Sequence, residues 1–139
     1  MKNILTILFA TFFLNTFTHG QEVNNLKVQI IQKGADTIKV KNNIMTGFPV
    51  KSDEVWIRIY QDEKGKKVEY KIISMEVTVI TNFGHETMSG TYRNKYITGD
   101  VLKELKSFKS GDKIQISSLE IATPMGQKMD GGTFELTAK

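Results

Sequence analysis

The chain of 139 residues contains no cysteine and only two histidines. Without cysteine it forms no disulfide and no thiolate metal site, and it carries no lipid on a cysteine side chain. One histidine, His85, follows the first twenty residues and lies in a polar stretch beside Gly84, where an exposed loop imidazole is expected. A histidine-activated nucleophile, a metal site and a cofactor site are therefore not predicted.

Basic residues are scattered rather than clustered. The chain has 19 Lys and Arg against 15 Asp and Glu, a formal net charge of +4, and its only adjacent basic pair is Lys66-Lys67. Proteins that bind nucleic acid usually gather Lys and Arg on one face to neutralise phosphates. Nucleic acid is therefore not an expected partner.

Long apolar runs are absent except near the start of the chain. Lys2 precedes the apolar run Ile4–Leu14, and small residues follow at Thr18 and Gly20. This is the pattern of an export signal cleaved before Gln21, since a membrane span needs about 20 apolar residues. We expect residues 21–139 to form one exported domain without a membrane span, in the periplasm, on the outer surface or secreted. The lack of cysteine also favours a bacterial envelope protein.

An apolar alternation of period two dominates the remaining sequence and predicts strands half-buried on one face. The expected strands are Leu26–Ile30, Ile38–Val40, Val55–Tyr60, Val68–Thr81, Asp112–Ile121 and Phe134–Ala138. Residues 61–67 are expected to form a hairpin loop, and residues 82–94 a region of turns. This pattern predicts a mainly β fold, specifically an immunoglobulin-like β-sandwich, with a barrel as the main alternative.

Two local features refine this prediction. The apolar phase of Val68–Thr81 changes at Ile72-Ile73, which indicates a bulge or a crossing between sheets. One helix over about residues 98–109 is expected, capped by Thr98 and ended by Gly111 in the left-handed conformation. Its apolar stripe is Val101, Leu102, Leu105 and Phe108.

Four carboxylates surround the charged hairpin, namely Glu54, Asp62, Glu63 and Glu69. A pair of them could serve as acid and base in a hydrolase if two faced one cleft. Because lysines alternate with them, solvated ion pairs are the better interpretation. We expect no enzymatic activity.

Trp56, Arg58 and Tyr60 alternate along one predicted strand and would share a face. These residue types are enriched where proteins bind one another. The three are the candidate partner-binding residues. The alternative is that they lie covered beneath a loop or the helix.

The part of the chain from about residue 70 to 139 contains four short motifs in a fixed order. They are Ile73-Ser74-Met75-Glu76-Val77, Gly90 with Tyr96-Ile97-Thr98, Leu105-Lys106 with Gly111–Ile116, and Leu119–Gly126. In this order they resemble the C-terminal domain of the gliding-motility protein GldM, a component of the type IX secretion motor. The chain departs from that pattern at Met75, Thr123 and Met125, and in a longer spacing between Lys106 and Gly111.

The resemblance implies an immunoglobulin-like periplasmic domain that forms homodimers and binds envelope proteins of the secretion or motility machinery. Fold analogy alone does not choose between such a partner and an independent role. The leading hypothesis is therefore a non-enzymatic, exported protein-protein interaction module. The alternative is a small carrier with an apolar ligand or glycan inside the sheet. The carrier requires that Ile73, Met75, Val77, Val79, Ile114 and Ile116 leave an internal pocket.

Overall fold

The structure is a computed structural model and describes residues 26–139. The predicted export signal of residues 1–20 and its cleavage before Gln21 lie outside the described residues. Within the described part of the chain, no helix has the length and apolar character needed to cross a bilayer.

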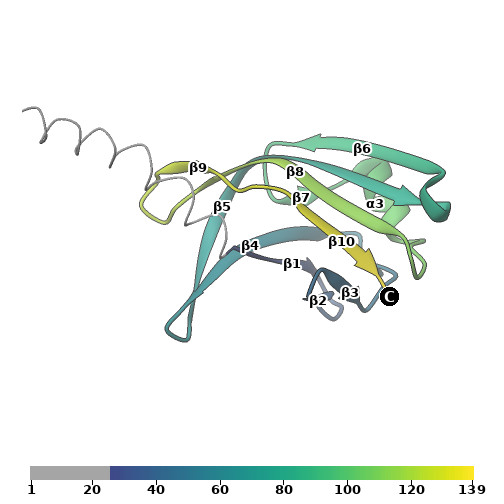
Figure 1. The fold of residues 1–139 in the computed structure, drawn as a ribbon, viewed down its shortest axis with the longest axis horizontal. Coiled ribbons are helices and arrows are strands. Elements are labelled where there is room, and N and C mark those ends of the chain that lie inside the picture. Colours follow the sequence, from purple (N-terminus) through teal and green to yellow (C-terminus); the bar gives the residue numbers. More distant parts are fainter. Residues whose placement is uncertain (1–25) are drawn as a thin grey trace, which may run out of the picture.

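The described residues form ten strands, one 3-10 turn and one α-helix (Figure 1). The elements are β1 (Lys27–Gln32), β2 (Lys39–Lys41), β3 (Ile44–Thr46), β4 (Val55–Glu63), β5 (Lys66–Thr81), η1 (Asn82–Gly84), β6 (Glu86–Tyr92), β7 (Tyr96–Ile97), α3 (Gly99–Leu105), β8 (Lys113–Ala122), β9 (Lys128–Asp130) and β10 (Phe134–Ala138). The prediction of a mainly β fold is confirmed.

The strands are hydrogen-bonded in the order β1-β4-β5-β8-β10-β3-β2, with β6 beside β5, β7 beside β4 and β9 beside β8. An isolated bridge between Ile30 and Ile38 brings the two ends of this order together. The sheet is thus nearly closed into a barrel. The immunoglobulin-like sandwich is not confirmed, because the strands follow one continuous pairing order.

The interior is filled by aliphatic side chains, as alternation along the strands predicts. Five of the six residues expected to face inward are buried in one core, namely Met75, Val77, Val79, Ile114 and Ile116. The sixth, Ile73, is only half-buried. The internal pocket that the carrier hypothesis requires is therefore not present among these residues.

The long strand β5 passes from one set of partners to another. Its first part pairs with β4 as far as Tyr70, and its later part pairs with β6 from Met75 onward. Its register with β8 shifts between Ile72 and Glu76. This confirms the predicted irregularity, because the alternation of buried residues shifts by one position between Tyr70 and Ile72 on one side and Met75 and Val77 on the other.

The helix begins as predicted but is shorter than predicted. Thr98 is at its N-cap with an extended backbone, although its side chain makes no capping hydrogen bond, and the last helical residue is Leu105. The predicted extension to residue 109 is wrong, because both the N–H and the hydroxyl of Ser107 donate to the carbonyl of Glu104 and tighten the chain into a turn. Phe108 is then free to enter the core, where its ring centroid lies 5.1 Å from that of Phe48.

Gly111 does not end the helix. It has φ +98° in the turn before β8, and its N–H donates to the carbonyl of Ala138 at 2.8 Å. The region of turns expected at residues 82–94 also contains a strand, because Glu86–Tyr92 form β6 along β5.

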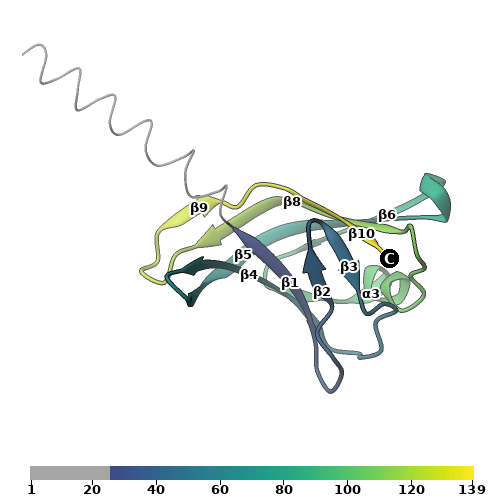
Figure 2. The same cartoon turned by 60° about the horizontal axis from the view of Figure 1, so that its bottom comes forward.

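Two hairpins project from the same end of the molecule. They are β4–β5, turned by Lys64 and Gly65 at positive φ, and β8–β9, as Figures 1 and 2 show. The turn between β5 and β6 lies at the opposite end. A surface groove lies at the base of the two hairpins.

Candidate functional site

The groove exists because β4 and β5 separate. Their pairing ends at Ile59 opposite Tyr70, and β4 then pairs with β7 through Trp56 and Tyr96. Strands β4 and β6 pair with the same edge of β5, and pairing with β6 begins only at Met75. Between them, residues Lys71–Ser74 have no strand partner on this edge among the described residues. A strand irregularity thus opens the sheet at one place.

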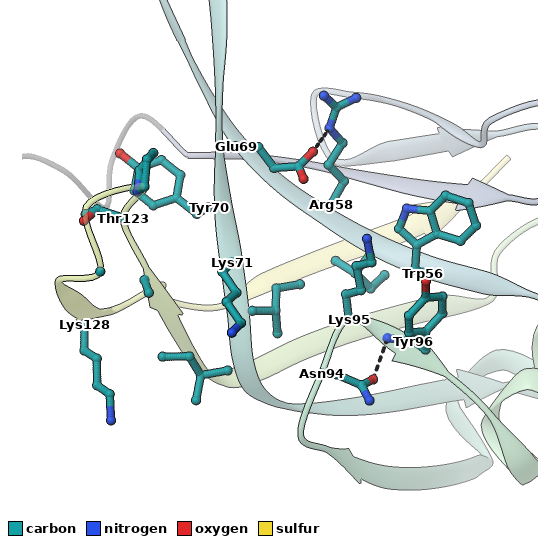
Figure 3. Close-up of a pocket in the computed structure, with 16 residues that line it drawn as sticks. Trp56, Arg58, Glu69, Tyr70, Lys71, Asn94, Lys95, Tyr96, Thr123 and Lys128 are labelled. Atoms are coloured by element: carbon teal, nitrogen blue, oxygen red, sulfur yellow. Dashed lines mark hydrogen bonds and ion pairs between the residues drawn. The ribbon is translucent and has the colours of Figure 1, made fainter.

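The opening forms a surface groove of about 690 Å³. One wall is built from β4 and the residues around β7, the base from β5, and the other wall from the β8–β9 hairpin (Figure 3). The lining residues are Trp56–Arg58, Glu69–Ile73, Asn94–Tyr96, Ala122–Pro124, Gly126 and Lys128.

An aromatic pair forms the first wall. The ring centroids of Trp56 and Tyr96 are 5.9 Å apart at an interplanar angle of 59°, a tilted arrangement that aromatic pairs favour. The Lys95 ammonium lies 5.6 Å from the Trp56 ring centroid and 5.5 Å from that of Tyr96. Tyr96 remains 37% exposed. The wall offers a mixed aromatic and cationic surface to a ligand.

The segment that carries this wall is fixed by hydrogen bonds at several points. The Ile57 N–H donates to the Lys95 carbonyl at 2.9 Å, and the Tyr96 N–H donates to Asn94 Oδ1 at 2.9 Å. The Tyr92 hydroxyl donates to the Thr98 carbonyl at 2.8 Å. Burial raises the pKa of Tyr92, so this hydroxyl stays protonated and remains a donor. The groove wall is preorganised rather than a loose loop.

The predicted residues Trp56, Arg58 and Tyr60 occupy alternate positions of β4, opposite Ile31, Gln29 and Lys27 of β1. Trp56 and Arg58 line the groove, whereas Tyr60 does not and is only 9% exposed. The Tyr60 ring lies beneath cations, 5.9 Å from the Arg58 guanidinium and 5.0 Å from the Lys67 ammonium. The structure therefore brings two of the three to one site and covers the third.

The groove is lined by more basic than acidic side chains. Arg58, Lys71, Lys95 and Lys128 line it together with a single carboxylate, Glu69. Glu69 forms an ion pair with Arg58 (Figure 3). Neither Lys71 nor Lys128 forms an ion pair with any residue in the described range 26–139. The groove consequently has an excess of positive charge.

The second wall is the turn at Pro124-Met125-Gly126. The Gly126 N–H donates to the Thr123 carbonyl at 2.8 Å, and the Gln127 N–H donates to Thr123 Oγ1 at 3.0 Å. Gly126 has φ +90°, a conformation that glycine adopts without a steric cost. Met125 at the tip is 95% exposed. The turn thus stands beside the groove as a defined wall.

The four carboxylates considered for hydrolysis are distributed around the sheet. Glu54 forms an ion pair with Lys33 at 3.5 Å, and Asp62 with Lys27 at 2.8 Å. Of the four, only Glu69 lines the groove. The preference for solvated ion pairs is supported for three of the four, although their partners are not the hairpin lysines that the sequence indicated.

His85 is exposed beside η1, and its N–H donates to the Asn82 carbonyl at 3.2 Å. Among residues 26–139, no group of three or more His, Cys, Asp or Glu side chains is arranged to hold a metal ion. The groove's chemistry is that of recognition by aromatic rings, cations and an open strand edge.

No family model matches the chain, and no curated protein matches its sequence. The functional argument therefore depends on the groove itself. Sequence reasoning missed Tyr96 and Lys95, because their proximity to Trp56 depends on the pairing of β4 with β7, between residues 40 positions apart along the chain.

Proposed function

We propose that the chain is a non-enzymatic, exported protein-protein interaction module that binds part of a partner in this groove. The observation that carries the proposal is the combination of the Trp56-Tyr96 pair with the open edge of β5 in one groove. Aromatic and arginine side chains contribute much of the free energy at protein interfaces.

The size of the groove agrees with this role. At about 690 Å³ it lies within the range of sites that bind ligands of several hundred daltons. Such a volume accommodates a few residues of a partner rather than a whole domain. The partner would therefore present a short segment, with weaker contacts around it.

The cellular location of the chain and its family are also part of the proposal. Residues 1–20 support export to the periplasm or outer surface, and the motifs from Ile73 to Gly126 support a GldM-like role with the secretion or motility machinery. The same resemblance underlies the proposed immunoglobulin-like relationship and a homodimer.

The proposal is tested by affinity purification from the native cell envelope with the full chain as bait. A Trp56→Ala, Tyr96→Ala variant should lose a partner that the wild type retains, because the aromatic wall is removed. Phe83→Ala is the matched control, since Phe83 is an exposed aromatic in η1, and the turn between β5 and β6 lies at the opposite end of the molecule.

Three outcomes are distinguishable, provided that thermal unfolding shows the variants to be folded. Loss of the same partner from both the groove variant and the Phe83 control, or from neither, would contradict the groove as the binding site. Recovery of a small apolar molecule or glycan without a protein would favour the carrier alternative instead. Loss from the groove variant alone is the result we expect.

A further inference from the structure

We infer that the segment bound in the groove is an extended, acidic stretch of polypeptide. This inference rests on the proposed function and adds the chemistry of the partner. It is argued from the charges of the groove, the open edge of β5 and the position of Lys95.

Charge complementarity selects an anionic ligand. The only carboxylate of the lining, Glu69, is already paired with Arg58, so Lys71, Lys95 and Lys128 are left to attract negative charge. Lys71 and Lys95 lie on opposite sides of the opening in Figure 3. Lys128 also shares a separate shallow depression with Glu120 and Asp130, which reduces its part in the groove. Lys71 and Lys95 are therefore the principal cations.

The backbone of β5 selects an extended polypeptide. Residues 71–74 have no strand partner on the groove side, whereas Lys71, Ile72 and Ser74 pair with β8 on the other side. At about 3.3 Å per residue, this gap is roughly 13 Å long and matches four residues of an added strand. A peptide can hydrogen-bond to such an edge while its alternate side chains face the groove.

An acidic glycan would pair with the lysines of the groove, but it would not match the other features of the groove. Sugars bind aromatic residues by stacking on a ring face, and the Lys95 ammonium lies over both Trp56 and Tyr96 at 5.6 and 5.5 Å from their centroids. One face of each ring is thus already in contact with a cation. An acidic side chain of a peptide can instead pair with Lys95 at that position.

The single tryptophan of the chain provides the assay, because Trp56 lines the groove. The full chain is titrated with an eight-residue peptide of alternating valine and glutamate, with valine-lysine and valine-serine peptides of the same length for comparison. We expect a saturable change of Trp56 fluorescence with the glutamate peptide only. The affinity should fall as salt is raised from 50 to 300 mM, since exposed charges are screened over about 10 Å at 0.1 M ionic strength.

Two charge-reversed variants locate the effect. Lys71→Glu, Lys95→Glu should raise the Kd for the glutamate peptide by about tenfold or more, the range expected for loss of close charge pairs. Lys39→Glu, Lys41→Glu is the matched control, because it changes the net charge equally on β2, away from the groove. The control should change the Kd by less than about threefold.

The outcomes separate this inference from the proposed function. Equal binding of all three peptides, or equal effects of the two charge-reversed variants, would overturn the acidic preference while leaving a binding groove. Saturable binding of polygalacturonate without binding of the glutamate peptide would overturn the polypeptide. No response to any peptide would also overturn the inference, and the envelope purification would then decide the proposed function independently.

Discussion

Phe83 has a backbone conformation that bulky residues rarely adopt. Its φ and ψ are 59° and 34°, and its side chain is 94% exposed at the tip between β5 and β6. The left-handed region costs an L-residue about 1–2 kcal/mol, and asparagine tolerates it best after glycine. Because little burial would be lost, Phe83→Asn should raise the free energy of unfolding by about 0.5–1 kcal/mol.

Urea unfolding of the two proteins measures this difference. A matched control is Met125→Asn, which removes an equally exposed apolar side chain from the other turn. A lower stability of Phe83→Asn relative to wild type would show that the Phe83 side chain makes contacts that its exposure does not suggest.

Asp53 and Lys106 provide a test of pH dependence. The Lys106 ammonium donates a hydrogen bond to Asp53 and, with its charge, holds the pKa of that carboxyl below its ordinary value of 3.8. A lowered pKa in the folded state means that the stabilisation is fully present above the unfolded pKa and is lost as the pH falls through the folded pKa. Asp53→Asn should therefore be slightly less stable than wild type above about pH 5, and the difference should shrink as the pH falls below about 4.

Thermal unfolding across this range measures the effect, which should be small because both groups are exposed and screened by salt. Glu63→Gln is the control, because Glu63 is exposed and forms no ion pair with any of residues 26–139. A difference between Asp53→Asn and wild type that persists undiminished at pH 2 would contradict the ion pair as its cause.

At the scale of elements, Gln32 joins β1 to two loops. Its side-chain nitrogen donates to the Asp36 carbonyl at 2.8 Å, and its oxygen accepts from the Lys51 and Ser52 N–H groups at 2.7 and 3.2 Å. Gln32 is buried, so its removal would leave these backbone groups without a partner. Gln32→Ala should lower the free energy of unfolding by about 2–3 kcal/mol.

Gln29→Ala is the control on the same strand, because Gln29 is half-exposed and should cost less than about 0.5 kcal/mol. Urea unfolding of both variants gives the comparison. Equal losses would show that the Gln32 hydrogen bonds do not contribute specifically.

Gly131 fixes the close approach of the chain after β9 to β8. A Cβ at this position would lie 2.6 Å from Leu119 Cδ2 and 2.7 Å from Leu119 Cγ, while the Gly131 N–H donates to the Leu119 carbonyl at 2.7 Å. Because the hydrogen bond holds the two segments together, Gly131→Ala should lower the free energy of unfolding by about 1–3 kcal/mol.

A double-mutant cycle with Leu119→Ala identifies the cause. If the clash with Leu119 is responsible, Gly131→Ala should cost less in the Leu119→Ala background than in wild type. Additive costs would contradict this explanation.

The elements also show what the sequence could predict. The phase change at Ile72-Ile73 is local, so it was visible and is confirmed in β5. Strand β6 was missed, because its sequence contains Thr, Ser and Gly, and its position is set by pairing with β5 rather than by its own alternation. The helix was predicted too long, because Phe108 continues the apolar stripe from a turn.

At the scale of the whole molecule, the site depends on where strands separate. Trp56 and Arg58 were predicted because their types and alternation lie within one strand. The groove itself was not predicted. It forms because β4 pairs first with β5 and then with β7, and because the β8–β9 hairpin supplies the other wall. Pairings between distant segments leave no periodic signal in a single sequence.

The measurement that tests the central claim most directly is hydrogen-deuterium exchange of the full chain, alone and with its purified envelope partner. If the groove is the binding site, protection should be confined to residues 56–58, 69–74, 94–96 and 122–128, with the open edge of β5 at residues 71–74 showing the largest change. Protection confined instead to the turn at residues 82–85, or to β6, with the groove unchanged, would contradict it.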